Sequence, residues 1–165
     1  MSILVIGATG FIGPRLIRKL VARGQTVVGM DLSPGAAAFA DVPIGAPVLR
    51  GDITQFEDVM RILLEVKPER VINLAYGLGM GEGNPHLAMR LDILGMDNCF
   101  EAARLAGVRR IAYASSVAVS GQQSNFGERL ATEDDPVYGT SQYAMHKIFN
   151  EFHARKYIKN YGMSI

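Results

Sequence analysis

The chain has 165 residues, 48% of them hydrophobic, and its 17 basic and 16 acidic side chains leave a net charge of +1. That length suits one domain with a substantial core, and the balanced charge excludes a strong attraction to nucleic acid or to a membrane surface. We find no long apolar run and no basic-then-apolar start, so we expect neither a membrane span nor a secretory signal. A single cysteine, Cys99, excludes an internal disulfide and favours a cytoplasmic location.

Short apolar runs alternate along the chain with longer segments of helical periodicity. We predict strands at residues 3–6, 26–30, 47–51, 70–76 and 109–115, and helices at about 12–23, 55–66, 84–106 and 140–160. Thr54 is the expected N-cap of the second helix, and Asn84-Pro85 is typical of the start of the third. This alternation predicts one α/β domain over residues 1–165, a doubly wound parallel sheet in three layers, α/β/α.

A glycine loop, "GATGFIG", lies between the first strand and the first helix. Gly7 lets the chain turn off the strand, Gly10 lets the backbone approach a pyrophosphate, and Gly13 lets the helix pack closely on the sheet. The helix N-terminus then faces the phosphates. A glycine trio can also mark tight turns only, but this position favours a Rossmann-type nucleotide site. We therefore expect Gly7, Gly10, Phe11, Ile12 and Gly13 to contact the cofactor.

Two aspartates follow the second and third strands. Asp31 could accept hydrogen bonds from both ribose hydroxyls of NAD and would repel the 2′-phosphate of NADP. No Arg or Lys occurs in residues 31–49, so NAD is favoured; the alternative is a turn-forming Asp before Ser33-Pro34. Asp52 could accept from the adenine amino group with Ile53 against the ring, or it could cap a helix.

The fourth strand leads to Ala75 and Tyr76, which we expect to pass near the cofactor. Farther along, "YGTSQYAMHK" contains Tyr138 and Tyr143, and only Tyr143 has a lysine, Lys147, four positions later. Such a pair shares one face of a helix. A phenol with a pKa of about 10 needs a nearby positive charge to act as a base at neutral pH. The alternative is a solvated lysine beside a buried tyrosine.

With these features and "YASSVAVSG" in order, the chain resembles the extended short-chain dehydrogenase/reductase family, of the NAD-dependent epimerase/dehydratase type. The family motif YGxSK is imitated by "YGTSQ", with Gln142 in place of the lysine. Family members commonly have a glutamate four residues after the lysine and a "YG" at the end of the helix. Glu151 and Tyr161-Gly162 fit when counted from Lys147, so the resemblance implies Tyr143 and Lys147 as the pair.

The resemblance further implies a catalytic trio of Ser116, Tyr143 and Lys147. Ser116, five residues before Gly121, would align the substrate; Tyr143 would take its hydroxyl proton while hydride passes to NAD; Lys147 would also hold the nicotinamide ribose. The alternative for Ser116 is a structural cap. The implied function is an NAD-dependent epimerase or dehydrogenase acting on a nucleotide sugar, without a metal; the alternative is a nucleotide-binding or sensor module without turnover.

Several features depart from the family pattern. The family is about twice as long, so we expect this chain to lack the C-terminal substrate-binding part. Asp92 stands where asparagine is common, and Val117-Ala118 stand where the sugar dehydratases have Asp-Glu, which argues against dehydration. The 84–106 helix is apolar around its whole girth, which predicts either a homodimer through the 84–106 and 140–160 helices or packing beneath the polar loop at 120–136.

Overall fold

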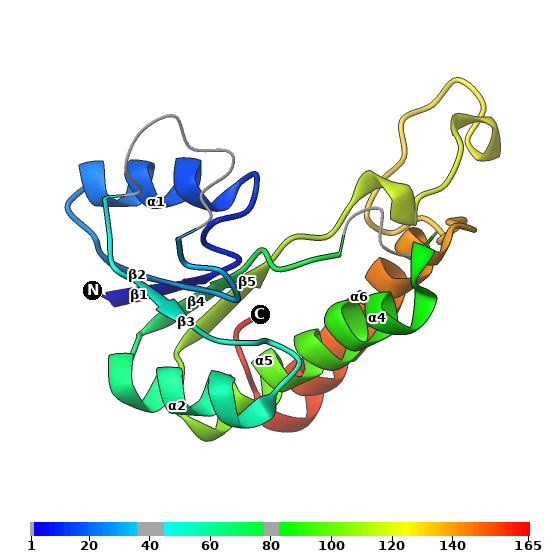
Figure 1. Ribbon diagram of the computed structural model, residues 1–165. Coiled ribbons are helices and arrows are strands. Elements are labelled where there is room, and N and C mark those ends of the chain that lie inside the picture. Colours follow the sequence, from blue (N-terminus) through cyan, green and yellow to red (C-terminus); the bar gives the residue numbers. More distant parts are fainter. Residues whose placement is uncertain (1, 36–44, 78–82) are drawn as a thin grey trace.

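The computed structural model describes residues 2–35, 45–77 and 83–165. Its centre is a five-stranded parallel sheet with the order β3-β2-β1-β4-β5 (Figure 1). The strands are β1 (Ser2–Ile6), β2 (Thr26–Asp31), β3 (Val48–Arg50), β4 (Arg70–Asn73) and β5 (Arg110–Tyr113). The winding direction reverses between β1 and β4, which makes the sheet doubly wound. The predicted fold class is confirmed.

The helices follow the predicted order. They are α1 (Gly13–Ala22), α2 (Phe56–Val66), α4 (Pro85–Met89), the π-helical turn η1 (Arg90–Leu94), α5 (Gly95–Leu105) and α6 (Gln142–Tyr161), with short 3₁₀ turns η2 (Val117–Val119) and η3 (Gln123–Asn125). The Asn84 side chain accepts from Leu87 N at 2.9 Å and is the expected cap of α4. The predicted helix over 84–106 is therefore one segment that contains a π-turn.

The predicted cap of α2 is wrong. Gln55, not Thr54, occupies the N-cap position, and it makes no side-chain capping bond. The Thr54 N–H donates to Asp52 Oδ1 at 2.9 Å, and the Asp58 carboxylate, in the first turn of α2, accepts from Asp52 N at 3.0 Å. The chain enters α2 through this aspartate-stabilised turn, so Thr54 stands one residue too early to cap the helix.

Strand β1 divides the core between the two faces of the sheet. Ile3 and Val5 pack with Ile17 on the side of α1, while Leu4 and Ile6 belong to the larger core cluster on the opposite side. Alternate residues of a strand point to opposite faces, so this pattern needs helices on both. Figure 1 shows α1 on one face and α2, α5 and α6 on the other.

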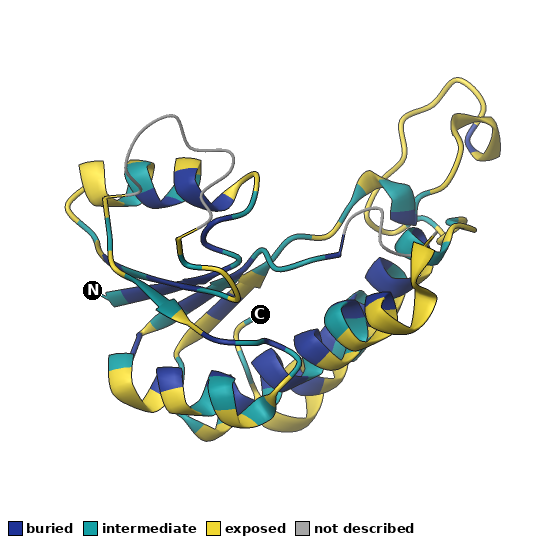
Figure 2. Cartoon of the chain, viewed as in Figure 1, coloured by how far each residue is buried: buried dark blue, intermediate teal, exposed yellow. Residues whose placement is uncertain are grey.

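The apolar girth of α5 is explained largely by packing within the chain. Met96, Cys99 and Phe100 are all buried in the core that α5 shares with α2 and α6. Figure 2 shows α4 largely exposed and α6 with exposed residues along its whole length. Large apolar side chains remain exposed there, from the α4–η1 segment Leu87, Met89 and Leu94, and from α6 Met145, Phe149 and Phe152. Among the described helices, none combines the length and apolarity needed to span a bilayer.

Candidate functional site

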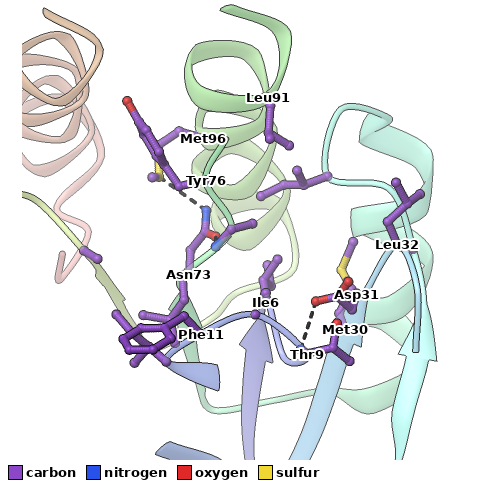
Figure 3. A pocket seen from close by; sticks show the side chains of 18 of the residues that line it. Ile6, Thr9, Phe11, Met30, Asp31, Leu32, Asn73, Tyr76, Leu91 and Met96 are labelled. Carbon is purple, nitrogen blue, oxygen red and sulfur yellow. Dashed lines mark hydrogen bonds between the residues drawn. The ribbon is translucent and has the colours of Figure 1, made fainter. Parts of the chain in front are cut away.

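A cavity of about 640 Å³ opens at the carboxyl ends of the central strands (Figure 3). Its lining includes almost all of the predicted cofactor residues and two of the predicted trio: Gly7, Gly10, Phe11, Ile12, Asp31, Asp52, Ile53, Ala75, Tyr76, Tyr143 and Lys147. Gly13 is buried behind this lining. Ligands of doubly wound sheets bind at such a switch point because the adjacent connections leave in opposite directions there.

The three glycines of the loop meet different constraints. Gly7 has a φ of +81°, and a Cβ on it would lie 2.7 Å from Ala75 N; a Cβ on Gly13 would lie 2.3 Å from Gly7 O. Both glycines are therefore required by the fold. A Cβ on Gly10 would meet only Gly7 O, at 3.4 Å. The fold itself tolerates a side chain at position 10, so the reason for glycine there lies on the cavity side.

The start of α1 fits a negatively charged group. Ile12 is the N-cap residue and makes no side-chain capping bond, and the first turn contains no acidic residue. The first backbone N–H groups of a helix have no partner within the helix and form the positive end of its dipole. With space left above Gly10, these groups fit the pyrophosphate of a dinucleotide.

Asp31 has a structural role as well as a place on the cavity wall. Its Oδ2 accepts from Thr9 N at 3.0 Å, a bond drawn in Figure 3, and its Oδ1 accepts from Ser33 N at 3.2 Å. The turn-forming bond considered from the sequence is thus present. A carboxylate oxygen can accept more than one hydrogen bond, so Asp31 retains capacity for ribose hydroxyls.

Asp52 also stabilises a turn of the backbone. The Asp52 carboxylate bonds Thr54 N, and the buried Ile53 is held by Asn98 Nδ2, which donates to its carbonyl at 2.9 Å. Both residues line the cavity. Their positions are fixed by the protein itself before any ligand arrives.

Two tyrosines and one lysine form a compact group at the far end of the cavity. The Tyr76 and Tyr143 rings meet edge to face with centroids 5.0 Å apart, and Lys147 Nζ lies 3.7 Å from the Tyr76 ring centroid and 5.8 Å from that of Tyr143. The ammonium also donates to Ala114 O at 2.5 Å. Tyr76 is therefore a cation–π partner of Lys147, a role that no sequence signal indicates.

Burial and the charge of Asp92 shift the pKa values of Tyr76 and Lys147. Burial raises the pKa of Tyr76, and the negative charge of Asp92 raises it further. Tyr76 consequently stays protonated at neutral pH and is unsuited to act as a base. Burial lowers the pKa of the Lys147 ammonium to about 8, while Asp92 opposes that fall. Lys147 therefore remains mostly charged at pH 7.

The predicted serine lies apart from this group. Ser116 lines a neighbouring cavity, of about 1060 Å³, and its hydroxyl accepts from Ala118 N at 3.2 Å as the N-cap of η2. Ser115 lines both cavities, and its hydroxyl donates to Glu151. The structure thus brings Tyr143 and Lys147 together but does not bring Ser116 into the same cavity.

The rival tyrosine is outside the site. Tyr138 precedes α6 and packs edge to face on Phe126, with ring centroids 5.6 Å apart. Ser141 caps α6, accepting from Ala144 N at 3.1 Å, so Gln142 is the first helical residue. Tyr138 and Gln142 cannot share a helix face, whereas Tyr143 and Lys147 do.

Comparison with known proteins agrees with this geometry. Residues 3–165 match the family described as "NAD dependent epimerase/dehydratase family". The chain belongs to this family. Over 172 residues it is 34% identical to the UDP-glucose 4-epimerase of Mycolicibacterium smegmatis, a match that covers 99% of this chain and 53% of the epimerase.

Solved structures extend the comparison. The UDP-glucose 4-epimerase of Thermus thermophilus, in complex with NAD, superposes with a TM-score of 0.87 at 32% identity, over 99% of this chain and 52% of that one. A partial consensus L-threonine 3-dehydrogenase also reaches 0.87, at 26% identity, over 99% and 52%. The chain spans about half the length of the relatives it matches. The predicted resemblance is confirmed, and so is NAD as the cofactor of this family.

The differing demands on the loop glycines make a testable contrast. Gly10→Ala should leave the melting temperature nearly unchanged. It should weaken NAD binding tenfold or more, about 1.4 kcal/mol, because the methyl group of the introduced alanine would point into the cavity. Gly13→Ala should instead lower the free energy of unfolding by roughly 2 kcal/mol through overpacking. Urea denaturation and calorimetric titration with NAD measure both. Equal loss of stability in the two variants would contradict the conclusion that the fold requires glycine at position 13 but not at position 10.

Proposed function

We propose that the protein is an NAD-dependent enzyme that epimerises the sugar of a nucleotide sugar. The principal support is that Tyr143 and Lys147 line the same cavity as the glycine loop and Asp31. In addition, the family match extends over residues 3–165. The similarity to two UDP-glucose 4-epimerases supports a nucleotide-sugar substrate.

In the proposed mechanism, this chain supplies binding groups and a proton acceptor. The start of α1 binds the pyrophosphate, and Asp31 accepts from the adenosine ribose. Tyr143 takes the proton of a substrate hydroxyl at its phenol oxygen and later returns it. The Lys147 ammonium lies on the same face of α6, 5.8 Å from the Tyr143 ring centroid, and would hold the nicotinamide ribose. When bound, NAD would supply the acceptor and donor of a hydride at the sugar carbon.

Two other functions have specific support. The likeness to an L-threonine 3-dehydrogenase favours simple oxidation of an alcohol, which would release NADH. The placement of Ser116 in the neighbouring cavity favours a sensor that binds NAD without turnover. The expected cytoplasmic location remains a prediction.

A single set of assays separates these functions. The protein is incubated with NAD and either UDP-glucose or UDP-galactose, and the sugar products are resolved by chromatography while absorbance at the NADH band is followed. Epimerase activity should interconvert the sugars with no net NADH. Steady NADH formation with an alcohol such as L-threonine would favour the dehydrogenase, and NAD binding without any product would favour the sensor.

The choice between the two tyrosines can be tested directly. Tyr143→Phe should reduce kcat by about 10³-fold, the usual contribution of a general base, with little change in NAD affinity. Tyr138→Phe is the matched control, because it removes the same hydroxyl five residues away, outside the cavity. It should retain near-normal turnover. The reverse pattern would assign the proton transfer to Tyr138.

The role of serine can be tested with a neighbouring pair. If Ser116 aligns the substrate hydroxyl in the transition state, Ser116→Ala should lower kcat by about 10²-fold. Ser115→Ala, which loses only the bond to Glu151 in this proposal, should have a small effect. A large loss for Ser115→Ala alone would transfer the role to Ser115, whose side chain lines both cavities.

We also propose a homodimer through the exposed apolar side chains of α4, η1 and α6. Phe149 is 45% exposed and stacks on His153, with ring centroids 5.3 Å apart. Phe149→Glu should place a charge in the interface and shift the protein to monomer, as measured by sedimentation equilibrium. Leu64→Glu, on the exposed side of α2, is the control and should leave the mass unchanged. A wild-type monomer at micromolar concentration would contradict the dimer.

A further inference from the structure

A buried carboxylate behind the cavity has no part in the proposed chemistry. Asp92 lies in the π-turn η1 and is only 2% exposed. Its Oδ1 accepts from Gly77 N at 2.8 Å, and its Oδ2 is 2.9 Å from His146 Nδ1. The carboxylate thus joins the segment after β4 to α6. Its two partners, Gly77 and His146, are the sequence neighbours of Tyr76 and Lys147.

The π-turn is part of this arrangement. Asn150 Nδ2 donates to the backbone carbonyl of Asp92 at 2.9 Å, one helical turn after His146 on α6. Both the side chain and the backbone of Asp92 are therefore held by α6. π-turns inside longer helices are frequent at functional sites because the extra residue redirects the backbone locally.

His146 contacts Asp92 through one ring nitrogen, Nδ1. Its Nε2 is buried, and no described residue accepts a hydrogen bond from it. Among the described residues, the His146 ring therefore has one hydrogen-bond partner, the Asp92 carboxylate at Nδ1.

The Lys147 ammonium needs a negative charge nearby. It is 3% exposed, and its closest partners, Ala114 O and the Tyr76 ring, are neutral. A buried ammonium without a counter-charge is strongly unfavourable. Among the residues that the structure describes, Asp92 is the one carboxylate in the buried set.

We propose that Asp92 is a positioning residue for Lys147: its buried carboxylate ties the exit of β4 to α6 and balances the charge of the ammonium. Asp92 does not touch the reacting atoms in this role; it acts through Lys147 and Tyr76. The inference rests on the proposed function for the importance of Lys147 in turnover, but not for the charge pair itself.

The titrating groups around the pair are consistent with this role. The segment after β4 contributes Tyr76, and α6 contributes Tyr143, His146 and Lys147. The residue after β5 contributes a neutral group, the Ala114 carbonyl. Asp92 raises the pKa of Lys147 against the larger effect of burial, which brings that pKa to about 8. Removing the carboxylate should therefore release the ammonium proton at lower pH.

The test follows the titration of Lys147 in the cofactor-free chain by NMR of ¹³Cε-labelled lysine, with the signal assigned by its loss in Lys147→Arg. We expect a midpoint near pH 8 in the wild type and about one pH unit lower in Asp92→Asn, the isosteric neutral variant. Asp92→Ser is a second neutral variant and should shift the midpoint in the same direction. Circular dichroism checks that each variant is folded.

A matched control lies between α6 and α5, the helix that directly follows η1. Asp97 on α5 also pairs with a histidine of α6, with Asp97 Oδ1 2.7 Å from His153 Nε2, but this pair is partly exposed. Asp97→Asn should leave the Lys147 midpoint unchanged. An unchanged midpoint in folded Asp92→Asn would overturn the proposal, as would a wild-type Lys147 already uncharged at pH 7.

Turnover gives a separate measurement. In an active enzyme, Asp92→Asn should move the alkaline fall of kcat to lower pH, because the ammonium is lost earlier as pH rises. A protein without turnover would contradict the proposed function and leave the NMR result standing. An epimerase whose Asp92→Asn variant keeps the wild-type titration would contradict only the role of Asp92.

Discussion

The candidate site depends on a close backbone contact between the glycine loop and the end of β4. Gly7 leaves no room for a side chain against Ala75, and Gly13 leaves none against the Gly7 carbonyl. These contacts bring the start of α1 to the point where the connections after the paired strands β1 and β4 leave in opposite directions. The positive helix end, the exit of β4 and the carboxylate of Asp31 therefore surround one cavity.

The part of that cavity lined by Tyr143 and Lys147 comes from α6, which lies far from the glycine loop in the sequence. Lys147 is almost fully buried, and its surroundings come from the segments after β4 and β5 and from η1 as well as from its own helix. A buried charge needs partners in fixed positions. The two tyrosines and Asp92 are such partners. The helical segment that contains η1, and α6, are therefore both part of the site.

Family membership and the structure contribute different information. The family match and the NAD complex of a relative define the cofactor, while the cavity shows which residues of this chain surround the space for it. The two serines lie where the cavities meet, Ser115 on the wall of both and Ser116 on the wall of the second. A substrate that extends from the first cavity into the second would pass both hydroxyls.

The sequence by itself determined the order of strands and helices, the α/β class and the glycine loop, because these follow from local periodicity and from glycine sterics. Spacing also showed that only Tyr143 has a lysine four positions later, while the family resemblance made it the predicted catalytic tyrosine, which remains a prediction. Only the tertiary structure revealed the Tyr76–Lys147 contact, the π-turn and the Asp92–His146 pair. The two contacts join residues that lie far apart in the sequence, and no local pattern encodes which buried charges will meet when helices pack on a sheet.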